Sequence, residues 1–120
     1  MILAIDHIQI AIPHGEEEKA RAFYRNVLGF TEIPKPPPLA KRGGAWFQSA
    51  NVQVHLGVEP DFRPARKAHP AFLVNHLDSL LAKIQHAGFD VDASQPALDG
   101  YKRAHVFDPF GNRIELMEKL

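Results

Sequence analysis

The segment HIQIAI (residues 7–12) has a counterpart in HPAFLV (residues 69–74), which begins 62 residues further along the chain. Two more landmarks repeat at offsets of 59 and 60 residues, namely Gly29-Phe30 as Gly88-Phe89 and VHL (54–56) as IEL (114–116). A nearly constant offset across three separate landmarks indicates a duplicated structural unit. The sequence therefore predicts two copies of one unit in tandem.

Composition confines the chain to a small set of protein classes. Its 120 residues suffice for one domain, and 14 Lys and Arg residues balance 14 Asp and Glu residues, so no basic excess indicates nucleic acid or an anionic membrane as a partner. The absence of cysteine excludes disulfides, thiolate zinc sites and cysteine nucleophiles. No signal peptide is recognisable, and no apolar run approaches the roughly 18 residues of a membrane span. We therefore expect a soluble cytoplasmic protein.

Hydrophobic periodicity predicts the same order of elements in both copies. Apolar and polar residues alternate over residues 8–12, as in a half-buried strand. An apolar stripe with helical spacing follows and ends at Gly29, a plausible C-terminal cap. Further strands are expected at residues 30–33, 45–48 and 52–58, and the second copy repeats the order with a strand at 69–74, a helix at 77–87 and strands at 89–93, 102–107 and 112–117. Each copy is thus a βαβββ module.

The predicted fold class is α+β. Two tandem βαβββ modules, residues 1–59 and 69–120, are joined by a linker at residues 60–68 and form an open, incompletely closed barrel around a central cavity. Within the first module, the proline-rich stretch PKPPPLAKRGG (34–44) is expected to be a loop, because proline cannot pair in a central sheet. The DPFGN segment (108–112) has the Asp, Pro and Gly of a tight hairpin turn.

Two pairs of residues that can bind a metal occupy equivalent places in the two modules, His7 with His69 and His55 with Glu115. Because residues i and i+2 of a strand share a face, His55 and Glu115 point away from the apolar residues beside them. His7 follows the same pattern, whereas His69 follows it less cleanly. The arrangement predicts a metal site made of His7, His55, His69 and Glu115.

Such a set of histidines and a carboxylate suits one divalent first-row ion, which would be Zn, Ni, Mn, Co or Fe. Imidazole and carboxylate ligands do not select strongly among these ions. Three of the four histidines outside the set, His14, His76 and His86, are expected at turns or helix ends.

A second polar face is predicted on the strand at residues 102–107, where Arg103 and His105 lie on one side. The guanidinium fork of Arg103 suits a carboxylate or a phosphate. The linker adds three positive charges, Arg63, Arg66 and Lys67. We therefore expect an anionic substrate, with a solvated outer strand face as the alternative.

The chain resembles the vicinal oxygen chelate superfamily, which includes lactoylglutathione lyase, fosfomycin-modifying transferases, methylmalonyl-CoA epimerase, extradiol dioxygenases and bleomycin-binding proteins. The segments that carry the resemblance are DHIQIAI (6–12), FYRNVLGF (23–30), VHL (54–56), HPAFLV (69–74) and DPFGNRIEL (108–116). The resemblance implies metal ligands at His7, His55, His69 and Glu115, with Glu115 and His55 as the catalytic candidates. It also implies substrate contacts at Trp46 and His105, and a homodimer.

One position departs from the pattern of lactoylglutathione lyases, which usually have glutamate where this chain has His55. A metal-bound carboxylate at that place can move the substrate proton. A neutral imidazole bound to a metal accepts a proton poorly, so this particular activity is not expected.

The expected function is that of a metal-dependent glyoxalase-like enzyme, a lyase, isomerase or transferase whose ion acts as a Lewis acid on substrate oxygens. A metal-free small-molecule or antibiotic-binding protein is one alternative, although such a protein would not need His7, His69 and Glu115. A non-haem iron extradiol dioxygenase is the other, because two histidines and one carboxylate suit that chemistry. A fourth ligand at His55 would crowd the positions that dioxygen and a bidentate substrate need.

Overall fold

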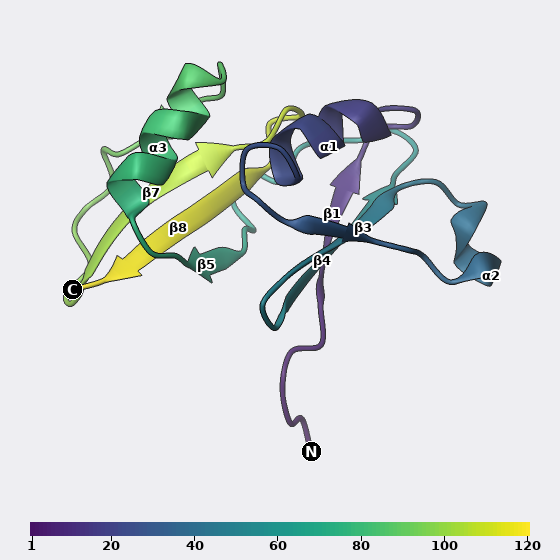
Figure 1. Cartoon of the computed structure of the whole chain (residues 1–120), viewed down its shortest axis with the longest axis horizontal. Helices are drawn as coiled ribbons and strands as arrows, with labels where there is room; N and C mark the ends of the chain where they lie inside the picture. The colour runs from purple at the N-terminus through teal and green to yellow at the C-terminus, as the bar shows by residue number, and fades with distance from the viewer. The chain divides into compact units, whose positions relative to one another are not determined.

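A computed structural model describes all residues from 1 to 120, and the chain divides into two compact units, Met1–Arg63 and Pro64–Leu120. The division falls within the predicted linker at residues 60–68. Figure 1 shows a longer helix beside the strands of each unit, α1 in the first and α3 in the second.

The first unit holds one four-stranded sheet with the strand order β1-β4-β3-β2. Its elements are β1 (Ile8–Ile12), α1 (Glu17–Tyr24), β2 (Thr31–Ile33), α2 (Pro37–Ala40), β3 (Ala45–Ser49) and β4 (Val52–Val58). β1 pairs with β4 in parallel, whereas β4 with β3 and β3 with β2 are antiparallel. Because β1 and β2 are both edge strands, this sheet is open.

The second unit repeats that topology with the strand order β5-β8-β7-β6. Its elements are β5 (Ala71–Leu73), α3 (Leu77–His86), β6 (Val91–Asp92), β7 (Tyr101–Phe107) and β8 (Arg113–Lys119). β5 again pairs with β8 in parallel, and the other pairs are antiparallel. The predicted fold class, α+β with two βαβββ modules, is confirmed.

The strand registers show which residues of the two units are equivalent. The row that crosses the first sheet is Ile33, Trp46, His55 and Gln9, and the matching row of the second sheet is Asp92, His105, Glu115 and Ala71. His7 stands two residues before Gln9, and His69 stands two residues before Ala71. His7 and His69 are therefore equivalent, as are His55 and Glu115, which agrees with the repeat offsets in the sequence.

The apolar core of each unit comes from the strand residues that face the helix. In the first unit, Ile12 of β1 and Val54 of β4 are fully buried together with the α1 side chains Ala20, Phe23 and Tyr24. In the second unit, Ile114 and Leu116 of β8 are buried with Leu77 and Ile84 of α3. The opposite face of each sheet is thus free to carry polar side chains.

The elements differ from the sequence prediction where proline intervenes. The stretch 34–44 contains the short helix α2, because Pro37 occupies the start of the helix, where its missing N–H needs no partner. The strand expected from residue 69 begins at Ala71, since Pro70 contributes a carbonyl to Glu115 N but has no N–H for the ladder. None of the helices is long and apolar enough to span a membrane.

Replacing Gly44 with alanine should destabilise the protein by about 2–3 kcal/mol, because a Cβ there would lie 2.0 Å from the Leu56 carbonyl oxygen at a φ of +80°. Gly29 is the matched control, since its φ is +83° and nothing lies within 4 Å of the added Cβ. Gly29→Ala should cost only about 1 kcal/mol of strain. Urea unfolding of both variants tests this, and equal losses would contradict the close approach at Gly44.

Candidate functional site

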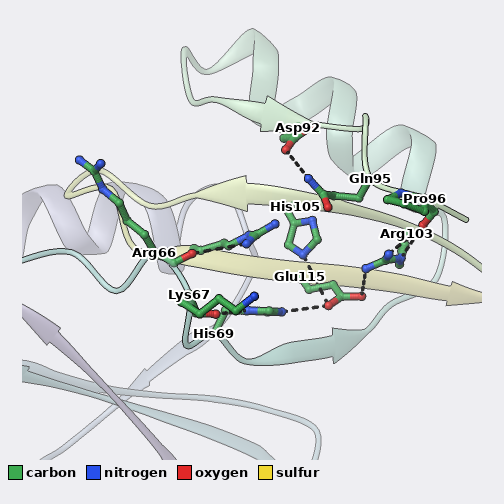
Figure 2. Close-up of polar contacts among 10 residues, drawn as sticks. Arg66, Lys67, His69, Asp92, Gln95, Pro96, Arg103, His105 and Glu115 are labelled. Carbon is green, nitrogen blue, oxygen red and sulfur yellow. Dashed lines mark hydrogen bonds and ion pairs between the residues drawn. The ribbon is translucent and has the colours of Figure 1, made fainter. Parts of the chain in front are cut away.

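Three side chains of the second unit converge on the face of the sheet opposite the helix. His69 precedes β5, His105 lies on β7 and Glu115 lies on β8, and one ligand atom from each is within 4.8 Å of the others. Figure 2 shows the imidazoles of His69 and His105 both directed at the Glu115 carboxylate. The register that pairs His105 with Glu115 brings two of the three together.

Hydrogen bonds fix the orientation of the His69 ring. Its Nδ1 lies 2.8 Å from the Lys67 carbonyl oxygen, and its Nε2 lies 3.0 Å from Glu115 Oε1. Because a carbonyl can only accept, Nδ1 carries a proton and donates it to Lys67. Nε2 then faces Glu115 either as a protonated donor or as a lone pair suited to a metal. The arrangement with a lone pair on Nε2 is typical of histidines that bind a metal through one nitrogen and donate the N–H of the other nitrogen to a carbonyl.

Glu115 is buried, with 8% of its surface exposed, yet it stays ionised. Burial raises the pKa of its carboxyl, but the hydrogen bonds from His69 and from Arg103 together outweigh this effect. The pKa therefore lies below the usual 4.5. Arg103 Nη1 donates to Glu115 Oε2 over 3.1 Å. The carboxylate is therefore an anion at neutral pH, which is the form that binds a divalent ion.

Arg103 also holds the chain that leads into β7. Its Nε and Nη2 donate to the Pro96 carbonyl oxygen over 3.2 and 2.7 Å, while Nη1 reaches Glu115. All three nitrogens of the guanidinium are thus engaged within the protein. The predicted contact between Arg103 and a substrate anion stays a prediction, since these bonds use three of the five N–H groups of the guanidinium.

His105 is almost completely buried, with 2% of its surface exposed. Burial lowers its pKa below the usual 6.5, and the nearby positive charge of Arg113 lowers it further. Its Nε2 lies 3.6 Å from Glu115 Oε1, and its Nδ1 is buried without a hydrogen-bond partner. His105 is therefore a neutral imidazole with an unused polar atom, which suits either a metal or a ligand.

The first unit brings together His7, His55 and Trp46. The His55 ring lies between the other two, with centroid distances of 4.0 Å to His7 and 3.7 Å to Trp46. Burial lowers the pKa of His55 below 6.5, and His7 lowers it further. His55 Nε2 lies 3.1 Å from the side-chain oxygen of Gln53, so Nε2 is the protonated nitrogen and Nδ1 keeps its lone pair.

The predicted site residues thus fall into two groups, each within one unit. His7, His55 and Trp46 form the first group, and His69, Arg103, His105 and Glu115 form the second. Neutral imidazoles and an ionised carboxylate are the donor forms that a divalent first-row ion requires, so the residues fit such an ion. The roles of Lys67, Gln53 and Pro96 could not be predicted from the sequence, because no residue pattern signals a carbonyl oxygen that meets a side chain.

Two buried polar residues hold the turn between β7 and β8. Asp108 accepts hydrogen bonds from the backbone of Phe110 and Asn112 and from Asn112 Nδ2, all between 2.8 and 2.9 Å. Asn112 Oδ1 in turn accepts from Ala65 N over 2.9 Å. The turn that the DPFGN segment predicts is thereby tied to the chain that leads to His69.

The sequence profile of the Glyoxalase/Bleomycin resistance protein/Dioxygenase superfamily matches residues 4–116. This chain belongs to that superfamily. The matched range contains the candidate site residues of both units, from His7 in the first to Glu115 in the second.

Individual relatives agree with this assignment. A putative glyoxalase family protein from Bacillus anthracis has 48% sequence identity over 100% of this chain and 98% of its own, with a TM-score of 0.94. An antibiotic binding protein from a Streptomyces species shares the fold at a TM-score of 0.74 and 24% identity, over 99% of this chain and 100% of its own. The mitochondrial methylmalonyl-CoA epimerase of Bos taurus is 49% identical over 39 residues, which span 32% of this chain and only 21% of that protein.

We predict that the metal-free protein loses stability as the pH falls below about 6.5, because the unfolded chain protonates histidines that the folded state keeps neutral. The lowered pKa values of His55 and His105 give this sign, since their contribution is present above the unfolded value of 6.5 and is lost below it. His105→Gln should flatten the slope of unfolding free energy against pH between 7 and 5. His86→Gln, at an exposed site, should leave the slope unchanged. Chemical unfolding across this range in the presence of a chelator is the measurement, and parallel slopes for wild type and His105→Gln would contradict it.

Proposed function

We propose that this chain is a divalent-metal-dependent, glyoxalase-like enzyme that acts on a small substrate with chelating oxygens. One observation carries the proposal: His69 Nε2 lies 3.0 Å from Glu115 Oε1, and both side chains are oriented by a further hydrogen bond. His69 Nδ1 donates to the Lys67 carbonyl oxygen, and Glu115 Oε2 accepts from Arg103. Ligands that are oriented by outer hydrogen bonds are typical of metal centres.

The proposed ligand set is His7, His55, His69 and Glu115. In the first unit, His7 Nδ1 lies 2.9 Å from Asp6 Oδ2, which leaves its Nε2 available, and His55 keeps a lone pair on Nδ1. In the second unit, His69 Nε2 and the Glu115 oxygens are the available atoms. Zinc, nickel, manganese, cobalt and iron all accept such donors.

A bound ion would supply Lewis acidity toward the substrate oxygens. The protein's part is to keep its own groups in the required states and orientations. Glu115 stays ionised, and the stacking of Trp46 and His7 on His55 fixes the plane of that ring. His105 stays neutral and buried beside Glu115, and its Nδ1 has no hydrogen-bond partner in the protein. Isomerisation, epimerisation, elimination and nucleophilic addition all suit this arrangement.

A metal-free binding protein is the second candidate, and one observation favours it. A protonated His69 would donate to Glu115 directly and satisfy both groups without an ion. The antibiotic binding protein from Streptomyces shares the fold, so the fold also occurs in a protein that binds a small molecule. An iron-dependent dioxygenase stays a further alternative, and exposure of the iron-loaded protein to catechols with oxygen uptake as the readout would test it.

The ligand set predicts that wild-type protein binds about one divalent ion per chain, and that His69→Ala weakens zinc binding by about 100-fold or more. His86→Ala is the matched control, because His86 is exposed at the end of α3 and should change the affinity less than twofold. Elemental analysis and calorimetric titration give both values. Less than about a tenth of an equivalent in zinc-, nickel- or manganese-treated wild type would favour the metal-free candidate.

A homodimer is the proposed assembly. The segment before β1 exposes four large apolar side chains, Met1, Ile2, Leu3 and Ile5, and Figure 1 shows it running out beyond the strand. Contiguous exposed apolar surface is typical of contact sites between proteins. The double variant Leu3→Asp, Ile5→Asp should lower the sedimentation-equilibrium mass from dimer to monomer, and a monomeric wild type would contradict the proposal. The cytoplasmic location stays a prediction.

A further inference from the structure

A cavity of about 610 Å³ lies in the second unit on the polar side of its sheet. Its charged lining residues are Arg66, Arg113, Asp90, Asp92 and Asp108, and Phe107 provides an apolar wall. Cavities of this volume hold small molecules in other proteins. Arg113 is two residues from Glu115 on β8, so the cavity continues the face that carries the candidate ligands.

Arg113 has the least satisfied guanidinium of this face. Its Nε is buried without any hydrogen-bond partner, and its Nη1 makes only a long contact of 3.4 Å with the Arg66 carbonyl oxygen. A buried donor on a permanent cation is costly when it meets no acceptor, so the guanidinium of Arg113 keeps unused capacity for hydrogen bonds. Arg103, by contrast, is engaged at all three nitrogens by Pro96 and Glu115.

The carboxylates of the cavity differ in how free they are. Asp92 accepts hydrogen bonds from Ser94 N, Ser94 Oγ and Gln95 Nε2. Asp108 is buried and accepts three hydrogen bonds within the turn between β7 and β8. Asp90 is exposed, and its carboxylate makes no hydrogen bond or ion pair. Neutral groups of the protein hydrogen-bond the carboxylates of Asp92 and Asp108 and hold them in place, whereas Asp90 is a negative charge without such bonds in the same cavity as Arg113 and Arg66.

We propose that Arg113 recognises the anionic group, a carboxylate or a phosphate, of the small molecule that this face binds. The inference rests on the proposed function in that the chelating oxygens of the same molecule would meet His69 and Glu115. Alternate residues of a strand are about 7 Å apart, so the anionic group and the chelating oxygens belong to a short molecule. A guanidinium fork binds either anion through two parallel hydrogen bonds. Arg66 adds a second positive charge at the rim of the cavity.

Titration of malonate and of inorganic phosphate into the zinc-loaded and the zinc-free protein tests the proposal. Arg113→Met keeps an unbranched apolar side chain and removes the guanidinium, and it should weaken malonate binding by about tenfold or more. Arg113→Lys should recover part of the loss. Asp90→Asn removes the free negative charge and should strengthen binding about two- to fivefold, since like charges oppose binding. Lys83→Met, which removes an exposed charge from α3, is the control and should change binding by less than twofold.

The outcomes separate this inference from the proposed function. Wild-type protein that binds neither anion at about 10 mM, or Arg113→Met that binds malonate as wild type does, overturns the role of Arg113. If Arg113→Met fails to fold, the opposite shift expected of Asp90→Asn decides the matter, and an unchanged affinity in that variant overturns the proposal. Zinc binding is measured on the same samples. Arg113-dependent malonate binding without zinc binding would leave the anion site standing and refute the metal-dependent enzyme.

Discussion

The hydrogen bonds that Asp108 makes within the turn between β7 and β8 are the interaction on which the rest of the second unit depends. Its two oxygens accept from the backbone of Phe110 and Asn112 and from the Asn112 side chain. This closes the turn in the register that sets His105 opposite Glu115. Asn112 and Arg113 also bond the backbone of Ala65, which secures the chain a few residues before His69. A small buried polar network thus places three side chains from three separate segments.

The two units show how one backbone supports two kinds of side-chain organisation. Trp46 and His55 occupy the positions that His105 and Glu115 occupy in the other unit. In the first unit, ring stacking holds the histidine, since His55 lies between two planar groups. In the second unit, charged hydrogen bonds hold the carboxylate between His69 and Arg103. Duplication preserved the register of the strands while the chemistry at equivalent positions diverged.

Much of this organisation could be predicted from the sequence, because it follows from periodicity. Repeat offsets and strand parity are properties of the backbone, so they predicted the two βαβββ units and the equivalence of His7 with His69. Parity also predicted that Glu115 faces away from the core side chains Ile114 and Leu116. The metal and substrate roles of these residues stay predictions.

The partners of individual side chains could not be predicted in this way. Arg103 turns toward Pro96 and Glu115 because the chain before β7 happens to bring a carbonyl oxygen near its fork. Arg113, for which no role was predicted, lines a cavity together with residues of the turn after β7. The helix α2 was not predicted either. Its stretch of sequence contains four prolines, which favour a loop, and this outweighs the single signal for a helix, a proline at the first helical position. Each miss concerns loops, whose course depends on tertiary contacts.

The strand order of the units has a consequence for the sequence of events in folding. β3 with β4 and β7 with β8 are hairpins between neighbouring segments, whereas β1 and β5 are edge strands that pair with distant partners. His69 and Glu115, for example, are 46 residues apart. Local pairs close at a smaller entropic cost, so we expect the hairpins to form first and the parallel edge strands to dock last. His7 directly precedes β1, and His69 lies two residues before the start of β5. The step that completes each unit is therefore also the step that delivers its histidine, and local opening of an edge strand would remove it again.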